Sequence, residues 1–404
     1  MELQIFKLAC IFFVIVLLTF FHRPLYQSIL AGILTTGVLY GISPIQMGRL
    51  IMNAVSSWSD MSILVILYLI TFLQRMLEKR QQIKLAQQDL NDLFNNRRLN
   101  ASIAPLFIGL LPSAAAMILC GDIVKESTDG YLDRKEQAFV ASWFRHIPES
   151  SLPTYSGVLL MSNLAGVDIA SFMVGMIFPV MVMFALGYFL YLRKLPKDTG
   201  ALPSHNKRQG FAGLIKHLWS LMLIILLILV FGISVVNSVG IVIIIALFIY
   251  HFRWEEIRPM FRNAIEKRML VNTFLILVFK EFINYTGVIH ALPEFFGQFP
   301  IPMFMVFSLL FFFGGIVSGT SGIIALGTTM AFRSIPGAGM PLMVLLMCMC
   351  HAASQISPTH VCLAVITECF GITMGDLVRK TLPVILIFMT IITGYYQILL
   401  QFIS

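Results

Sequence analysis

The chain has 404 residues, of which 58% are hydrophobic and only 12% are charged. A soluble protein carries about 25% charged residues, so this composition excludes a soluble globular protein and leaves no room for a sizeable soluble domain. The formal net charge of +8 would suit a nucleic acid partner, but the basic residues lie in short loops and on interfacial segments. Basic residues there orient a membrane protein, so we expect no nucleic acid partner.

Apolar segments recur along the whole chain, and a membrane span needs about 20 mostly apolar residues. Spans are predicted near 4–22, 25–42, 60–78, 134–166 and 168–192, and again near 213–236, 238–252, 269–285, 340–370 and 378–402. The first segment lacks a small-residue cleavage site and is followed at once by another span, so we expect it to be retained.

The chain divides into two halves, 1–192 and 213–404, joined by a basic linker at 193–212. In each half an amphipathic stretch precedes the third span, at 44–59 and 253–269, and is expected to lie in the membrane interface. If the N-terminus is outside, most basic groups fall on the cytoplasmic side. An odd number of spans per half makes the two halves inverted with respect to each other.

Two predicted spans, 134–166 and 340–370, are too long for simple helices and have polar centres. The centres have the sequences HIPESSLPT and HAASQISPT and contain Pro153 and Pro358. Proline lacks an amide hydrogen and disfavours helix at the residue before it, so both spans are expected to unwind there. The freed backbone groups need partners, which a bound ion or solute supplies in secondary transporters.

Two further apolar segments, 102–128 and 302–335, have small polar tips with the sequences LPSAA and VSGTSG. They are predicted to be re-entrant hairpins, because irregular backbone at membrane depth is tolerated only where protein or a watery cavity covers it. We expect the two tips and the two broken spans to meet near the membrane midplane and to form one site.

A faint internal repeat at an offset of 205 residues favours this architecture. It pairs His146 with His351, Pro153 and Thr154 with Pro358 and Thr359, Gly166 with Gly371, Gly109 with Gly314, and Ser113 with Ser318. These matches fall on the interruptions of the spans. The sequence therefore predicts an all-α polytopic membrane protein of two inverted repeats, each with about five spans, a re-entrant hairpin and a broken helix.

Several motifs carry a resemblance to a known family. They are NRRL at 96–99, GLLPSAAAM at 109–117, WFRHIPESSLPTYSGVLL at 143–160 and SPTHVCLAVITECFG at 357–371. They resemble an uncharacterised prokaryotic family of integral membrane proteins in the ion-transporter superfamily, together with divalent-anion/sodium symporters, arsenite permease and gluconate permeases. The resemblance implies an elevator-type homodimer in the lipid of the prokaryotic inner membrane, with a scaffold and a mobile transport domain.

The resemblance also implies site residues. In the dicarboxylate members, hairpin tips bind substrate carboxylates and sodium sits between each tip and a broken span. The substrate-binding positions carried over are Ser113, Ser318, Gly319, Thr320, Ser321, Thr154 and Thr359. The ion-coupling positions are Glu149, Ser150, Ser151, Ser354, Gln355, Ser357, His146 and His351. The first tip has no asparagine or threonine, which argues against a symmetric grip on a dicarboxylate.

Individual residues leave alternatives open. A carboxylate at membrane depth usually marks an ion or proton path, but Glu149 can also form a structural ion pair with Arg145, four residues back. His146, His351 and His360 are candidates for proton sensing, or for satisfying carbonyls at the ends of the broken helices. The hydroxyls of the second tip suit an oxygen-rich binding nest, whereas the alternative is close packing of small residues.

The functional hypothesis is a secondary active transporter, a symporter or antiporter, for a small anionic organic solute such as a carboxylate. Na⁺ or H⁺ would drive it, without another cofactor, and no phosphate-binding loop for ATP is present in the sequence. Alternatives are an efflux permease, a channel, although channel filters are commonly rings of repeated subunits, and an intramembrane hydrolase using the Ser, His and Glu of HIPESS.

We expect no catalytic residues and no metal site. The CMCH sequence at 348–351 resembles a metal-binding pattern. However, one span cannot easily turn all three ligands towards a single ion. Its cysteines are expected to pack as small hydrophobic residues.

Overall fold

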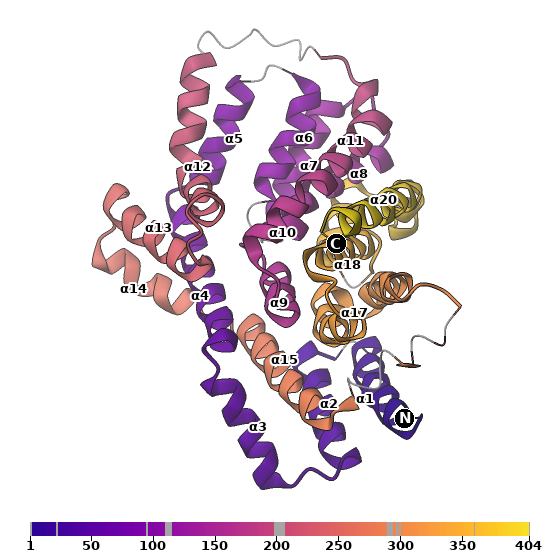
Figure 1. Ribbon diagram of the computed structural model, residues 1–404. Helices are drawn as coiled ribbons and strands as arrows, with labels where there is room; N and C mark the ends of the chain where they lie inside the picture. Colours follow the sequence, from indigo (N-terminus) through magenta and orange to yellow (C-terminus); the bar gives the residue numbers. More distant parts are fainter. Residues whose placement is uncertain are drawn as a thin grey trace.

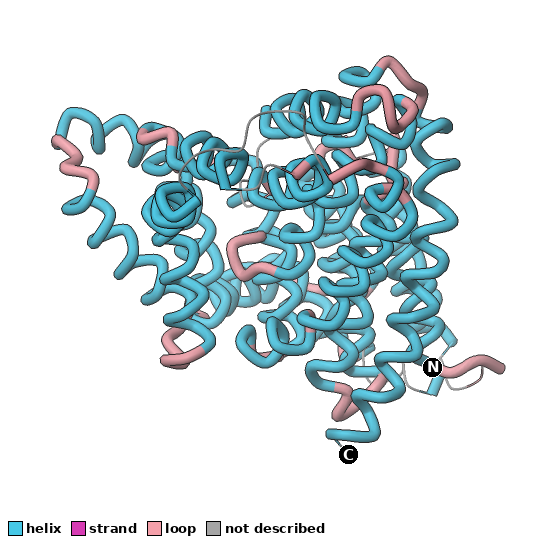
Figure 2. Tube along the Cα trace, turned by 90° about the horizontal axis from the view of Figure 1, so that it is seen from above, coloured by secondary structure: helices cyan, strands magenta, loops and turns pink. Residues whose placement is uncertain are grey.

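The protein is all-α, as the sequence predicts. The computed structural model describes residues 2–21, 23–93, 96–109, 115–197, 207–288, 294–295, 298, 300–358 and 360–403. Within these ranges every regular element is a helix (Figure 2). Six helical segments there are long and apolar enough to cross a membrane. The chain is therefore a multi-pass membrane protein.

The helices follow the predicted order of spans closely. The first half contains α1 (Glu2–Phe20), α2 (Leu25–Leu39), α3 (Pro44–Ser56), α4 (Trp58–Lys79), α5 (Gln82–Leu93), α6 (Arg97–Ile108), α7 (Ala115–Thr128), α8 (Arg134–Ser151), α9 (Ser156–Ala165), α10 (Ile169–Gly175), α11 (Ile177–Leu190) and the 3-10 helix η1 (Leu192–Lys194). The second half contains α12 (Lys207–Leu229), α13 (Val235–Ile249), α14 (Trp254–Asn263), α15 (Lys267–Thr286), α17 (Met303–Ser334), α18 (Gly339–Ser354), α19 (Val361–Phe370) and α20 (Met374–Ile403).

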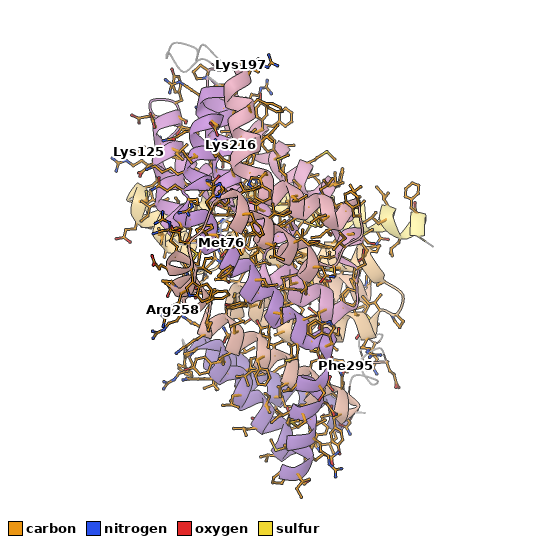
Figure 3. The ribbon with its side chains drawn as sticks, turned by 90° about the vertical axis from the view of Figure 1, so that its left-hand side faces the viewer. Met76, Lys125, Lys197, Lys216, Arg258 and Phe295 are labelled. Atoms are coloured by element: carbon orange, nitrogen blue, oxygen red, sulfur yellow. The ribbon has the colours of Figure 1, made fainter. Side chains whose placement is uncertain are left out.

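These helices form two groups that pack mainly within themselves (Figure 1). We call α6 to α11 with α17 to α20 the site group, and α1 to α5 with α12 to α15 the outer group. In the outer group α12 packs along α5, the charged arm after the third span. α12 begins at Lys207, within the predicted linker at 193–212. Lys197 and Lys216 project from the same end of the molecule (Figure 3).

The two broken spans are confirmed as the helix pairs α8–α9 and α18–α19. Both pairs end in the same way, because Gly166 and Gly371 terminate α9 and α19 with φ angles of 66° and 62°. Glycine adopts this left-handed conformation without the steric cost that a side chain would add. These two glycines lie 205 residues apart, at the offset that the sequence suggests for a repeat.

The segment Met303–Ser334 is a hairpin, although its hydrogen bonds describe one helix. At Gly319 the backbone leaves the helical region, with φ 73° and ψ 165°. A Cβ on Gly327 would lie only 2.5 Å from Cε2 of Phe311. In a straight helix these residues, 16 apart, would be about 24 Å apart. The chain therefore folds back at Gly319, which confirms the hairpin predicted over 302–335.

The first hairpin has α6 and α7 as its arms, which pack against each other and against α8. It begins before the predicted residue 102, because the Asn96 side chain accepts hydrogen bonds from the backbone of Arg98 and Leu99 and caps α6. Arg98 donates to the Leu195 carbonyl at 2.8 Å and to the Tyr188 hydroxyl at 3.0 Å. The NRRL motif thus starts the hairpin and ties it to the end of α11. The tip at 110–114 lies outside the described residues.

An ion pair joins two helices of the outer group and supports a prediction about stability. Nζ of Lys280 on α15 lies 2.6 and 2.8 Å from the carboxylate oxygens of Asp60 on α4. Asp60 is 1% exposed. We expect Lys280→Met to lower the free energy of unfolding by about 3–5 kcal/mol, because it leaves a buried charge without its partner.

The double variant Asp60→Asn with Lys280→Met removes both charges and should recover most of that loss. Thermal denaturation in one detergent compares the stability of the wild type, Lys280→Met and the double variant. A Lys280→Met protein as stable as the wild type would contradict the importance of this pair.

Candidate functional site

The breaks in the two spans arise from proline, but they start later than the sequence suggests. In the first span α8 continues through Pro148 and ends at Ser151. Leu152 then turns to an extended conformation, with φ −100° and ψ 143°, as expected for the residue before Pro153. His146, Glu149, Ser150 and Ser151 are therefore on the last turns of α8, and not in an unwound loop. Likewise, Ser354 is the last residue of α18.

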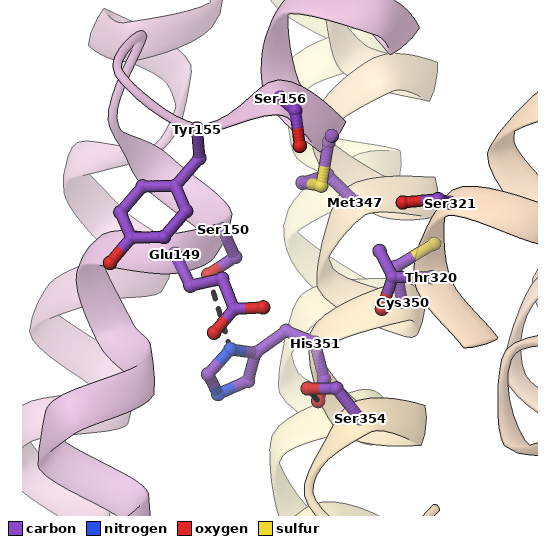
Figure 4. A pocket seen from close by; sticks show the side chains of 11 residues that line it. Glu149, Ser150, Tyr155, Ser156, Thr320, Ser321, Met347, Cys350, His351 and Ser354 are labelled. Atoms are coloured by element: carbon purple, nitrogen blue, oxygen red, sulfur yellow. Dashed lines mark hydrogen bonds between the residues drawn. The ribbon is translucent and has the colours of Figure 1, made fainter. Parts of the chain in front are cut away.

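A polar cavity lies where the breaks meet the second hairpin (Figure 4). Its lining comes from the end of α8, the start of α9, the turn of α17 and the end of α18. The residues are Glu149, Ser150, Tyr155, Ser156, Gly157, Thr320, Ser321, Met347, Cys350, His351 and Ser354. The volume is about 60 Å³, enough for an ion or two water molecules at about 30 Å³ each.

The structure brings together part of the predicted site. Glu149, Ser150, Thr320, Ser321, His351 and Ser354 line the cavity. The second tip therefore reaches both broken spans, as expected. Tyr155, Ser156, Met347 and Cys350 also line the cavity but were not predicted. Tyr155, Ser156 and Cys350 border the polar interruptions in the sequence, which could have indicated them, whereas Met347 lies one turn earlier on α18.

Other predicted residues support the backbone around the cavity. The Ser318 hydroxyl donates to the Gly314 carbonyl at 2.8 Å, and Gly319 forms the turn. The Ser151 hydroxyl donates to the Ile147 carbonyl at 2.9 Å. Gln355 accepts a hydrogen bond from Ser142 at 3.2 Å, Ser357 donates to the Ile316 carbonyl at 2.8 Å, and Thr154 lines a neighbouring hollow. Ser113 and Thr359 lie outside the described residues.

Each broken span is bonded to its own hairpin. In the second half Ser357 makes this link, by its bond to Ile316. In the first half Tyr155 makes it, because its hydroxyl donates to the Gly109 carbonyl at the end of α6. The hairpin and the broken span of each half therefore hold each other in place beside the cavity.

Glu149 carries an acidic group to the wall of the cavity. Its Oε2 lies 3.5 Å from Nη1 of Arg145 and 3.8 Å from Nε2 of His146. Arg145 is 2% exposed, whereas the Glu149 side chain is 28% exposed. The ion pair that the sequence suggested is present, but it leaves the carboxylate accessible from the cavity.

Two histidines of the broken spans contact residues on other helices. His146 does not end its helix. Its Nδ1 donates to the Ser142 carbonyl at 2.7 Å, and its Nε2 lies 2.9 Å from Nε2 of His360. Nδ1 of His351 lies 3.1 Å from the Ser150 hydroxyl, and its ring packs against aromatic side chains. His146 and His351 are equivalent in the repeat, but each faces a partner from the other half.

Further hollows extend from the cavity towards the outer group. A hollow of about 320 Å³ shares Ser156 and Ser321 with the cavity and also reaches Asn272 on α15. Another, of about 340 Å³, shares Ser156 and reaches Arg75 and Glu78 on α4. Two hollows lined by both groups of helices therefore border the cavity.

This geometry defines a class of protein: a multi-pass α-helical membrane protein in which two broken helices and a helical hairpin enclose a polar cavity. The fold is similar to that of the YdaH transporter of Alcanivorax borkumensis, known from a crystal structure. The TM-score is 0.57, the sequence identity is 13%, and the match covers 89% of each chain. The likeness at this identity concerns the fold.

The chain belongs to the family described as "Protein of unknown function (DUF401)", which matches residues 5–400. A comparison with curated proteins gave no match.

Proposed function

We propose that the protein is a secondary active transporter of a small anionic organic solute such as a carboxylate, driven by Na⁺ or H⁺. The observation that carries the proposal is the polar cavity, in which hydroxyls and one carboxylate gather at interrupted helices inside a membrane protein. Interrupted helices that meet around such a cavity are how secondary transporters build their sites. The fold shared with the YdaH transporter supports the same function.

The helix ends around the cavity suit an anion beside a cation. Ser156 begins α9, and Thr320 and Ser321 begin the second arm of α17, so two helix N-termini offer hydroxyls and partial positive charge to an anion. The C-terminal ends of α8 and α18 contribute Ser150 and Ser354 on the other side. Carbonyls there, together with Glu149, favour a cation.

The size of the cavity limits what binds in it. A volume of about 60 Å³ holds a carboxylate group or an ion, and not a whole metabolite. We infer that the charged head of the solute lies in the cavity and that its body extends into the hollow of about 320 Å³ beside it.

The larger-scale arrangement belongs to the same proposal. We infer membership of the ion-transporter superfamily, two inverted repeats, an elevator-type movement of the site group against the outer group, and a homodimer in the prokaryotic inner membrane with the N-terminus outside. The separate packing of the two helix groups and the matching ends of α9 and α19 support this inference.

One observation favours a hydrolase instead. The Ser150 hydroxyl lies 3.1 Å from Nδ1 of His351, as in a nucleophile and base pair. Such a base is normally oriented by a third group. Within the described residues, Nε2 of His351 has no hydrogen-bond partner. A serine-directed phosphonate probe that labels the wild type but not Ser150→Ala would support the hydrolase.

The first experiment measures thermal stability of the purified protein across a sodium series, at fixed ionic strength and two pH values. An ion that binds only the folded protein raises stability in proportion to RT ln(1 + [L]/Kd). A sodium-specific rise supports sodium coupling, and a response to pH alone supports proton coupling. Carboxylate uptake into proteoliposomes is then measured with and without that ion gradient. Uptake that ignores both gradients, or no uptake of any carboxylate, would contradict the proposal.

A further inference from the structure

Three metal-binding side chains meet behind the wall of the cavity. Nε2 of His146, a ring nitrogen of His360 and Sγ of Cys362 all lie within 4.8 Å of one another. His146 is fully buried, and the other two are half-buried. His146 belongs to α8, whereas His360 and Cys362 lie at the start of α19. The cluster therefore joins one broken span to the other.

We propose that His146, His360 and Cys362 bind a divalent transition-metal ion of the zinc class. Imidazole nitrogen and thiolate sulfur are the ligands that zinc prefers, and three protein ligands with one open position is a common arrangement. The inference goes beyond transport, since it concerns an ion that holds α8 against α19 whatever solute is carried. The CMCH segment that the sequence suggested is not part of this cluster.

The hydrogen bonding of His146 favours a metal. Its Nδ1 donates to the Ser142 carbonyl at 2.7 Å, which leaves the lone pair of Nε2 pointing at the cluster. Histidines that bind metals almost always donate their other ring nitrogen in this way, because the bond fixes the tautomer and the ring orientation.

The surrounding charges partly offset those of a dication. Glu149 Oε2 lies 3.8 Å from Nε2 of His146, so its carboxylate can reach the open position. A thiolate from Cys362 and this carboxylate would supply two negative charges, and Arg145, whose Nη1 lies 3.5 Å from Glu149 Oε2, offsets one of them.

The two ring nitrogens need only a small adjustment, whereas Sγ of Cys362, which lies within 4.8 Å of them, must come to about 3.5 Å from each. Metal–nitrogen bonds of about 2.0–2.1 Å in a tetrahedron place two nitrogens about 3.3 Å apart. The two Nε2 atoms of His146 and His360 are 2.9 Å apart, so the rings must separate by about 0.4 Å. A hydrogen bond that shares one proton would also suit 2.9 Å. A shared proton needs no thiol. A substitution of Cys362 therefore distinguishes a bound metal ion from a proton shared by the two histidines.

The test uses the full-length protein in detergent, treated with chelator and titrated with Co²⁺. We expect one saturable site per chain with a thiolate-to-cobalt charge-transfer band, which Zn²⁺ abolishes by displacing the cobalt. Cys362→Ser should remove the band and weaken Zn²⁺ binding more than about 100-fold, since the loss of a ligand costs more than the 10–100-fold loss of an outer partner. Cys369→Ser is the matched control, two turns further along α19, and should leave both unchanged.

Thermal stability measured without metal shows whether the variants are folded. Cys362→Ser changes one atom, so without metal it should have the same melting temperature as the wild type. No saturable cobalt site, or a site unchanged in Cys362→Ser, would overturn the proposal and leave the shared proton as the explanation of the short contact. Because binding is read from the metal itself, these outcomes do not depend on whether the protein transports a carboxylate.

Discussion

Replacing Glu149 with glutamine is expected to abolish the stabilisation by the coupling ion and to lower ion-driven uptake by roughly 100-fold or more. Among the described residues that line the cavity, Glu149 has the one carboxylate. Glutamine keeps the shape but removes the charge, so a desolvated cation would lose its anionic partner. Breaking a buried charge pair costs about 3–5 kcal/mol, and each 1.4 kcal/mol corresponds to about tenfold in binding.

The control is Glu368→Gln, which removes an exposed carboxylate from α19, away from the cavity lining. It should leave both the ion response and uptake unchanged. Thermal shift and proteoliposome uptake of the two variants are measured side by side. Glu149→Gln protein that still responds to the ion and transports at the rate of the wild type would show that Glu149 serves only to pair with Arg145.

The architecture could be predicted from sequence because its interruptions are set by local chemistry. Proline at 153 and 358 disfavours helix at the residue before it, and Gly319 provides the backbone conformation that the hairpin turn requires. Long apolar runs between such residues then predict the spans. Local signals are weaker at helix ends, as at the start of α12, which lies within the polar residues 193–212.

Much of the site could not be predicted, because it depends on how helices rotate and pack. The repeat aligned His146 with His351, but alignment compares positions in two halves and does not report contacts between them. Only the fold shows that His146 meets His360 and that His351 meets Ser150. The contact of Tyr155 could not be predicted either, since it is a hydrogen bond to Gly109, 46 residues away.

Gly109 supports the second prediction with a large effect. Its φ of −61° is open to any residue, so alanine there causes no backbone strain. However, a Cβ would lie 2.1 Å from the carbonyl oxygen of Arg145 on α8. Neither backbone can move without separating α6 from α8, so we expect Gly109→Ala to destabilise the protein by more than about 3 kcal/mol, at the severe end for one substitution. It should also abolish transport, because the shift displaces the helix that carries Glu149.

Gly314 is the equivalent position in the repeat and provides the matched control. A Cβ there would lie 2.5 Å from Cδ1 of Ile323, the end of a flexible side chain. Gly314→Ala should therefore cost only about 1–3 kcal/mol, as ordinary overpacking does, and Ile323→Val should relieve it. Thermal denaturation and uptake are measured for Gly109→Ala, for Gly314→Ala and for Gly314→Ala combined with Ile323→Val. If Gly109→Ala were as mild as Gly314→Ala, α6 would not lie against the Arg145 carbonyl, and the first hairpin could not hold the site as we describe.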